Sequence, residues 1–181
     1  MSTAAKILIT GGESTGKSTL CEQLAQQYKT LWVPEYARTY LQELDRPYEE
    51  SDLVLIAQGQ LSLEQAMHEE AHAYLFCDTG LEVIRVWSEH KYQRCDAWIL
   101  DQLAQVDYAG SILTAPDFAW EPDPLREHPD PYWRQYFFRC YTDLLSESGK
   151  PFCVVSGRQK ERLQQAVDFL HQLKLPLKVV R

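Results

Sequence analysis

The sequence lacks any long hydrophobic run. No apolar stretch approaches the roughly 18 to 20 residues that a helix needs to cross a bilayer. The N-terminal residues MSTAAKILIT also lack the long apolar core of a secretory signal. No segment rich in serine, glycine and proline divides the 181 residues, which are enough for one well-buried core. We therefore expect one cytoplasmic domain spanning residues 1–181, with no membrane partner.

Paired cysteines and clustered positive charge are missing as well. The five cysteines are scattered, odd in number and form no CxxC pair, which argues against a disulfide framework and a cysteine zinc site. The chain has 18 basic and 26 acidic residues, a net charge of −8, and no polybasic tract. Because binding to a phosphate backbone depends on clustered lysine and arginine, nucleic acid is not an expected partner.

Short apolar runs alternate with helical patterns along the chain, which is typical of a parallel sheet covered by helices. The expected strands are residues 6–10, 30–33, 74–77, 111–114, 152–155 and 177–180. Apolar and aromatic residues at four-residue spacing predict helices at 20–28 and 132–144. Residues 52–73 read as one long helix, with Ser51 as a plausible N-cap.

Residues 11–19, GGESTGKST, lie between the first expected strand and a helix. Their spacing fits GxxxxGK[ST], in which glycines let backbone N–H groups close around phosphate oxygens, the lysine reaches the terminal phosphates and the serine ligates magnesium. The N-terminus of the following helix adds partial positive charge. This predicts a P-loop NTPase fold, a three-layer α/β/α sandwich with a mainly parallel sheet of five to six strands. The residues expected around the phosphates are Gly12, Glu13, Ser14, Thr15, Gly16, Lys17, Ser18 and Thr19.

Two further acidic positions follow expected strands. Asp78 ends the third strand, where a carboxylate suits the magnesium shell or a base, although DTG also resembles a strand-to-helix turn with an aspartate N-cap. Glu35, Tyr36 and Arg38 follow the second strand and are candidate substrate-binding residues. Ligands of open parallel sheets bind outside the carboxyl ends of strands, so Glu35 and Arg38 are expected in the same crevice. The alternative is a Glu-Arg pair on the first turn of a surface helix.

The segment 115–131, APDFAWEPDPLREHPDP, is an irregular stretch with five prolines. Long ordered loops in compact domains tend to be lids or binding loops. An arginine on such a lid, here Arg126, neutralises charge on a transferring phosphoryl group, unless it is simply a solvated charge. Trp120 either stacks on a planar substrate or anchors the loop.

The run HEEAH at residues 68–72 competes with this interpretation, because it matches the HExxH pattern of zinc peptidases. A zinc site needs a third protein ligand, and the sequence offers no convincing one. The helix also leads directly into the third expected strand. We therefore favour two histidines on a solvated helix face.

Four segments together resemble the kinase domain of NadR-type nicotinamide riboside kinases, within the P-loop kinase group. They are GGESTGKSTL, VPEYAR, FCDTGLEVIRVWSEHKY and WEPDPLREHPD, and with the strand order they span nearly the whole chain. The resemblance implies transfer of the γ-phosphate of ATP to the 5'-hydroxyl of nicotinamide riboside, which gives nicotinamide mononucleotide for NAD synthesis. Larger relatives carry further domains before the kinase. Since this chain begins at the first expected strand, we expect a stand-alone kinase.

The resemblance also implies roles by position. The implied catalytic residues are Lys17, Glu35, Asp78 and Arg126, and the implied metal ligands are Ser18 and Asp78. ATP and Mg²⁺ are the implied cofactors. Whether Glu35 or Asp78 orients the sugar hydroxyl stays open.

The charged pyridinium ring of nicotinamide riboside favours aromatic faces and carboxylates. Candidates in or near the matching segments are Trp87, Tyr92, Trp120, Glu35, Glu121 and Asp123, although such aromatic residues also suit a core. Gly157 and Arg158, after the fifth expected strand, are candidates for bordering the adenine. The same layout serves kinases of other nucleosides or of nucleoside monophosphates, and a nucleotide-dependent switch. No pattern specifies an oligomeric state.

Overall fold

A parallel sheet forms the centre of the protein, of which the computed structural model describes residues 4–175. Its strands are β1 (Ala5–Thr10), β2 (Leu31–Val33), β3 (Tyr74–Asp78), β4 (Gly110–Thr114) and β5 (Phe152–Val155). They pair in the order β2-β3-β1-β4-β5, and every pairing is parallel. Five expected strands are thus confirmed to within one residue at each end. The sixth, 177–180, lies outside the described residues.

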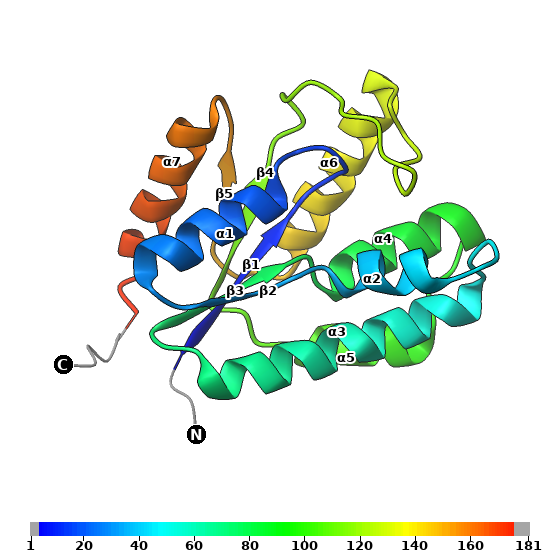
Figure 1. Ribbon diagram of the computed structural model, residues 1–181, viewed down its shortest axis with the longest axis horizontal. Coiled ribbons are helices and arrows are strands. Elements are labelled where there is room, and N and C mark those ends of the chain that lie inside the picture. Colours follow the sequence, from blue (N-terminus) through cyan, green and yellow to red (C-terminus); the bar gives the residue numbers. More distant parts are fainter. Residues whose placement is uncertain (1–3, 176–181) are drawn as a thin grey trace.

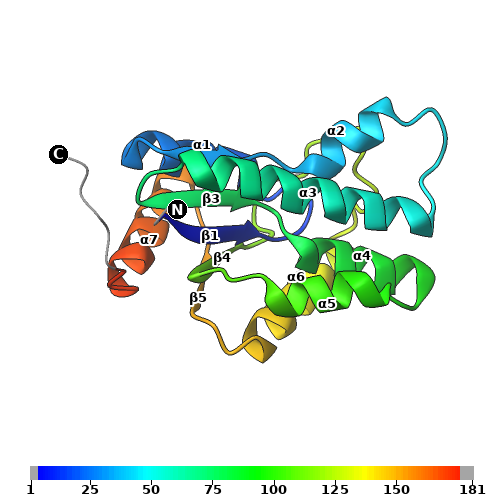
Figure 2. The same cartoon turned by 90° about the horizontal axis from the view of Figure 1, so that it is seen from below.

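Helices cover both faces of this sheet (Figures 1 and 2). On one face lie α1 (Lys17–Tyr28) and α7 (Gln159–Gln172), and on the other lie α4 (Leu81–Tyr92) and α6 (Pro131–Glu147). Because side chains alternate along a strand, Ile7 and Ile9 pack beneath α1 and α7, whereas Leu8 packs with the opposite helices. The predicted three-layer sandwich is therefore confirmed.

Helices also gather beyond one end of the sheet, as both views show (Figures 1 and 2). α2 (Tyr36–Glu43), α3 (Glu50–Glu70) and α5 (Ala97–Gln105) join α4 there around an apolar cluster that includes Ile56, Ile84 and Ile99. The helices predicted at 20–28 and 132–144 correspond to α1 and α6. The segment 115–130, which joins β4 to α6, lies at the same end of the sheet (Figure 1).

The start of α3 differs from the prediction. Its N-cap is Glu49 and not Ser51, and a capping box joins Glu49 to Asp52. The Asp52 carboxylate accepts hydrogen bonds from the Glu49 N–H at 2.7 Å, from the Tyr40 hydroxyl and from the guanidinium of Arg46. This arginine holds the pKa of Asp52 well below its usual range. The prediction of Ser51 as the N-cap is wrong, because the side chains of Glu49 and Asp52 each accept a hydrogen bond from the backbone N–H of the other at the start of the helix.

The end of α3 also differs from the prediction. The helix stops at Glu70, and Ala71 is already extended. His72 therefore lies outside the helix, while the Nε2 atom of His68 lies 2.8 Å from the carbonyl oxygen of Ala4. Because HExxH chemistry needs both histidines on one helical face, the HEEAH run does not form that geometry. None of the helices within residues 4–175 is long and apolar enough to span a bilayer.

Candidate functional site

A cavity of about 430 Å³ opens beside the carboxyl ends of β1, β2 and β3. Its polar side is the loop of residues 11–19, and its other walls come from α2, α3, α4 and the segment 115–130. Of the residues expected at a site, the following line it: Glu13, Ser14, Thr15, Gly16, Lys17, Ser18, Thr19, Glu35, Arg38, Trp87, Glu121 and Arg126. The structure therefore brings together residues that the sequence separates by more than one hundred positions.

The loop of residues 11–19 has a fixed, partly left-handed backbone. Gly11 and Gly16 have φ values of 140° and 79°, and a Cβ atom at Gly16 would lie 2.7 Å from the ring of Phe118. The Thr15 hydroxyl donates to the Gly12 carbonyl at 2.8 Å and also contacts the Thr114 hydroxyl at 2.7 Å. No side chain caps the N-terminus of α1, which begins at Lys17. Free N–H groups at a helix N-terminus suit a phosphate anion.

Lys17, Ser18 and Asp78 meet at the base of this loop. The Lys17 ammonium donates to the Gly12 carbonyl at 2.9 Å, and the Ser18 hydroxyl donates to the Asp78 carboxylate. Asp78 is 1% exposed, and burial raises its pKa to about 6 against the opposing effect of Lys17. Its Oδ1 atom has no hydrogen-bond partner among the described residues. This oxygen donor set fits Mg²⁺, which typically binds through one or two carboxylates together with substrate phosphates.

Glu35 and Arg38 approach the cavity from the start of α2. Glu35 is the N-cap residue of this helix and lines the cavity, and its negative charge adds to the rise in the pKa of Asp78. Arg38 donates to the Asp123 carboxylate at 2.8 Å, so the ion pair joins α2 to the segment 115–130. This hydrogen bond raises the pKa of Arg38. Asp123 itself is not among the residues that line the cavity, because it faces this arginine.

Tyr36 does not lie in the cavity, contrary to expectation. Its N–H donates to the side chain of Gln60 at 2.9 Å, and its ring covers Gly59 of α3. A Cβ atom at Gly59 would lie only 2.0 Å from that ring. Tyr36 therefore fixes α2 against α3, and this contact positions Glu35 and Arg38 on either side of it.

The loop of residues 11–19 holds the segment 115–130 directly. The Glu13 carboxylate accepts hydrogen bonds from the backbone N–H groups of Glu127 and His128, at 3.1 to 3.2 Å. Burial raises the pKa of Glu13, and these two N–H groups oppose that rise. The Ser14 hydroxyl contacts the other end of the segment, where it accepts from the Glu121 N–H at 3.0 Å. Glu13, which was expected around the phosphates, lines the cavity, and its side chain also contacts the segment.

Replacing Glu13 by alanine is expected to loosen the segment 115–130, because two backbone N–H groups lose their acceptor. Amide hydrogen exchange should report this directly. We expect exchange at Glu127 and His128 to accelerate by about tenfold, since one charge-assisted hydrogen bond stabilises by about 1.4 kcal/mol or more. Glu22→Ala, an exposed glutamate on α1, serves as the control. Unchanged exchange in the Glu13 variant would show that other contacts hold the segment.

The expected aromatic residues divide between the cavity and its surroundings. Trp87 lines the cavity and stacks on His128 and Phe137, at centroid distances of 5.4 and 5.2 Å. Tyr92 instead packs with the helix cluster, and its hydroxyl donates to the Tyr48 carbonyl. Trp120 faces Arg134, with the guanidinium carbon 5.8 Å from the ring centroid. Neither Tyr92 nor Trp120 is among the residues that line the cavity.

The apolar wall of the cavity was missed from the sequence. It contains Leu41, Tyr48, Leu53, Ile56, Val83, Ile84 and Tyr141. Most of these residues belong to α2, α3, α4 and α6, where their spacing is also that of ordinary core positions. No local signal distinguishes a core position from a cavity wall, because the difference depends on how the helices pack. Tyr48, in the loop before α3, has the same ambiguity.

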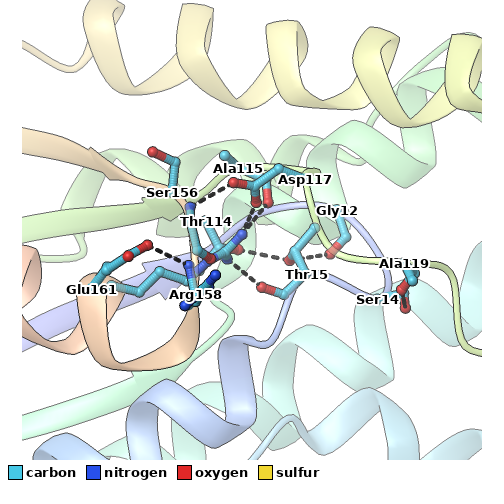
Figure 3. A network of polar contacts seen from close by, with 12 residues as sticks. Gly12, Ser14, Thr15, Thr114, Ala115, Asp117, Ala119, Ser156, Arg158 and Glu161 are labelled. Atoms are coloured by element: carbon cyan, nitrogen blue, oxygen red, sulfur yellow. Dashed lines mark hydrogen bonds and ion pairs between the residues drawn. The ribbon is translucent and has the colours of Figure 1, made fainter.

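The loop after β5 lies next to residues 11–19, the phosphate loop. The Gly157 N–H donates to the Asp117 carboxylate at 2.6 Å, and the Arg158 N–H donates to Glu161 at 2.8 Å (Figure 3). Gly157 and Arg158 do not line the cavity, whereas the adjacent Gln159 does. The backbone of this loop is therefore held by carboxylates from two different segments.

Relatives and similar structures agree with this architecture. The trifunctional NAD biosynthesis/regulator protein NadR of Escherichia coli K12 is 25% identical over 174 residues, which cover 92% of this chain and 42% of that protein. The NadR protein of Salmonella typhimurium matches to the same extent. The chain thus spans less than half the length of these curated relatives. The resemblance to NadR that the four sequence segments indicate is confirmed.

Solved structures show the same fold. A crystal structure of NadR protein in complex with NR has a TM-score of 0.75 at 20% identity, and the match covers 98% of this chain and 54% of that one. A thymidylate kinase from Candida albicans has a TM-score of 0.69 at 13% identity and covers 96% and 94%. Residues 6–162, from β1 into the first turn of α7, match the family described as AAA domain. Since that match includes most of the sequence, this chain belongs to the AAA domain family.

Proposed function

We propose that this protein is an ATP- and Mg²⁺-dependent kinase that transfers the γ-phosphate of ATP to the 5'-hydroxyl of nicotinamide riboside, giving nicotinamide mononucleotide. One observation carries the proposal. A single cavity is lined by a phosphate loop, with Lys17 and Ser18, and beside it by Glu35 and an apolar wall. A hydrolase or a switch needs the first part alone, whereas a kinase needs a place for the acceptor beside it.

The donor half binds and neutralises phosphate. Lys17 and the N-terminus of α1 line the cavity, and we assign them to the terminal phosphates of ATP. Mg²⁺ on Ser18 and Asp78 would offset the negative charge that develops during transfer. Arg126, from the segment 115–130, lines the same cavity and at present donates to the Glu121 carbonyl. We assign this segment the role of a lid, whose closure excludes water from the reaction.

The acceptor half suits a cationic nucleoside. We assign Glu35, which lines the cavity, the role of orienting the sugar hydroxyl toward the phosphate. Trp87 and Tyr48 provide aromatic faces, and the carboxylates of Glu121 and Glu127 lie on the lid side. A pyridinium ring is attracted both to aromatic faces and to carboxylates. Arg38 is already paired with Asp123, so it offers little free positive charge to a substrate phosphate.

The relatives support the same acceptor. NadR is described as an NAD biosynthesis protein, and a similar structure of NadR contains NR, which is nicotinamide riboside. A second NadR structure contains NAD and AMP-PNP, a non-hydrolysable form of ATP. The likeness to thymidylate kinase keeps nucleoside monophosphates as the rival acceptors.

A panel of acceptors tests the proposal. The purified protein is incubated with ATP and Mg²⁺ and with nicotinamide riboside, thymidine, deoxycytidine or thymidine monophosphate, and phosphorylated products are separated by chromatography. We expect kcat/KM for nicotinamide riboside to exceed the others by about 100-fold, which corresponds to about 2.7 kcal/mol of discrimination. Omission of Mg²⁺ is the control. Preference for another acceptor would contradict nicotinamide riboside, and ATP hydrolysis without any phosphorylated product would favour a switch.

A further inference from the structure

Arg162 is a buried arginine that none of the roles above requires. It lies in the first turn of α7, and its side chain is 3% exposed. The guanidinium donates to the carbonyl of Thr15 at 2.7 Å, to that of Ala115 at 3.0 Å and to that of Gly157 at 2.9 Å. It is also paired with the carboxylate of Asp117. Four of its five N–H donors are therefore used by three segments of chain that meet beside the phosphate loop.

The contact with Thr15 has a consequence for the phosphate loop. A peptide group is planar and trans, so the carbonyl of one residue and the N–H of the next point in opposite directions. Since Arg162 donates to the Thr15 carbonyl, the N–H of Gly16 points away from the guanidinium, and Gly16 itself lines the cavity. Phe118 adds a steric constraint, because its ring lies against Gly16 and the Arg162 guanidinium lies 3.9 Å from the ring centroid.

Asp117 extends the same network to the loop after β5. One of its carboxylate oxygens pairs with Arg162, and the other accepts from the Gly157 N–H at 2.6 Å. Figure 3 shows Asp117, Thr15 and Arg158, from three separate segments, converging on this network of polar contacts. The network therefore joins the phosphate loop to the loop that follows β5, the segment expected beside the base of ATP.

We propose that Arg162 is a positioning residue for ATP. It orients the Gly16 N–H toward the phosphates and, through Asp117, fixes the position of the loop after β5 relative to the phosphate loop. This inference rests on the proposed use of ATP as donor, but not on the identity of the acceptor. Arg162 is not among the residues that line the cavity. Its effect should therefore appear in nucleotide binding and leave acceptor binding unchanged.

The first test measures binding of AMP-PNP with Mg²⁺ by calorimetry, without acceptor. The variants are Arg162→Lys, which keeps the charge but has fewer and differently placed donors, and Asp117→Asn, which keeps the shape but removes the ion pair. We expect the Kd for AMP-PNP to rise about tenfold in both, as loss of one charge-assisted hydrogen bond predicts. The matched controls are Arg139→Lys on α6 and Asp168→Asn on α7, both exposed positions, with unchanged Kd.

Two results would overturn the inference. One is a Kd for AMP-PNP within about twofold of the wild type in the folded variants. If Arg162→Lys does not fold, the Kd of Asp117→Asn decides. The other is a rise in the KM for the acceptor that parallels the rise for ATP, which would indicate general loosening. Because the binding measurement contains no acceptor, it decides the role of Arg162 even if the acceptor panel contradicts nicotinamide riboside. A wild type that binds no AMP-PNP would contradict both proposals.

A second measurement reports on the peptide group itself. The chain has only eight glycines, so selective ¹⁵N labelling of glycine gives a spectrum in which Gly16 can be followed. We expect the Gly16 amide signal to be displaced in ligand-free Arg162→Lys, while that of Gly149, which has no neighbour within 4 Å of its Cβ position, stays in place. An unmoved Gly16 signal would contradict the proposed orientation.

Discussion

Replacing Lys17 by alanine is expected to abolish phosphoryl transfer while leaving the fold intact. The ammonium is the cation of the phosphate loop, and it donates a hydrogen bond to the Gly12 carbonyl. Its removal should therefore cost little stability but should lower kcat on the order of 10³-fold, because preorganised charge is a large part of catalysis of phosphoryl transfer. Initial rates with ATP, Mg²⁺ and nicotinamide riboside measure the effect, and circular dichroism checks the fold.

Lys150→Ala is the control for loss of a lysine. Lys150 pairs with the exposed Asp107. Lys150 precedes β5 and Asp107 precedes β4, so the pair lies at the opposite end of the strands from the cavity. Its kcat should match the wild type. Activity of more than a few per cent in folded Lys17→Ala would contradict the assignment of this lysine to the phosphates.

Replacing Asp78 by asparagine is the second change with a large expected effect. The variant keeps the shape of the side chain and an acceptor for the Ser18 hydroxyl, but it loses the charge that would hold Mg²⁺. We expect kcat at saturating ATP to fall on the order of 10²–10³-fold and to recover little with excess Mg²⁺. Asp168→Asn, on the exposed face of α7, is the control. Near-normal activity in folded Asp78→Asn would exclude Asp78 both as metal ligand and as base.

The pH dependence of Asp78 gives an independent check. Its pKa is raised to about 6 by burial, so the carboxylate is ionised above pH 6 and protonated below it. Activity that needs the carboxylate should therefore fall as pH decreases through about 6, and the plot of its logarithm against pH should approach a slope of one. In the wild type, kcat/KM for ATP measured between pH 5 and 8 should show this acid limb. An acid limb centred near pH 4 would contradict the buried, raised carboxyl group.

Stability without metal should show the opposite trend. Because the pKa of Asp78 is higher in the folded protein than in the unfolded chain, its ionised carboxylate destabilises the fold, and the contribution of Asp78 to the free energy of unfolding falls as pH rises from about 4 to about 6. Above pH 6, Asp78→Asn should be more stable than the wild type by up to about 3 kcal/mol, a difference that shrinks toward pH 4. Urea denaturation in EDTA measures it. Burial also raises the pKa of Glu82, to about 7. Because both proteins contain Glu82, its contribution cancels in the difference between their free energies of unfolding.

The strands were predictable because their signal is local. Runs such as KILIT and YLFC are short, apolar and bounded by glycine or charged residues, and buried parallel strands need such runs on both faces. The phosphate loop was predictable for a similar reason, since its glycines are required by local backbone angles at Gly11 and Gly16. Asp78 follows from its position at the end of a strand, without knowledge of its neighbours.

Helix ends were less predictable, because several residues compete for the same N–H groups. Ser51 and Glu49 both suit an N-cap by position. The choice of Glu49 depends on Asp52, which Arg46 and Tyr40 hold in place from the preceding loop and helix. The end of α3 at Glu70 similarly depends on the path that the chain takes into β3. Tertiary contacts thus decide between local alternatives of similar energy.

The sequence by itself determined the fold class, the phosphate loop and the strand ends that carry Glu35 and Asp78, since each depends on residues close together in the chain. Only the tertiary structure decided that Tyr36 and Trp120 do not line the cavity, that Glu13 holds the segment 115–130 and that Arg162 supports Thr15. The last contact joins residues 147 positions apart. Its energy depends on burial and on the geometry of several segments at once, and neither is encoded in any local pattern.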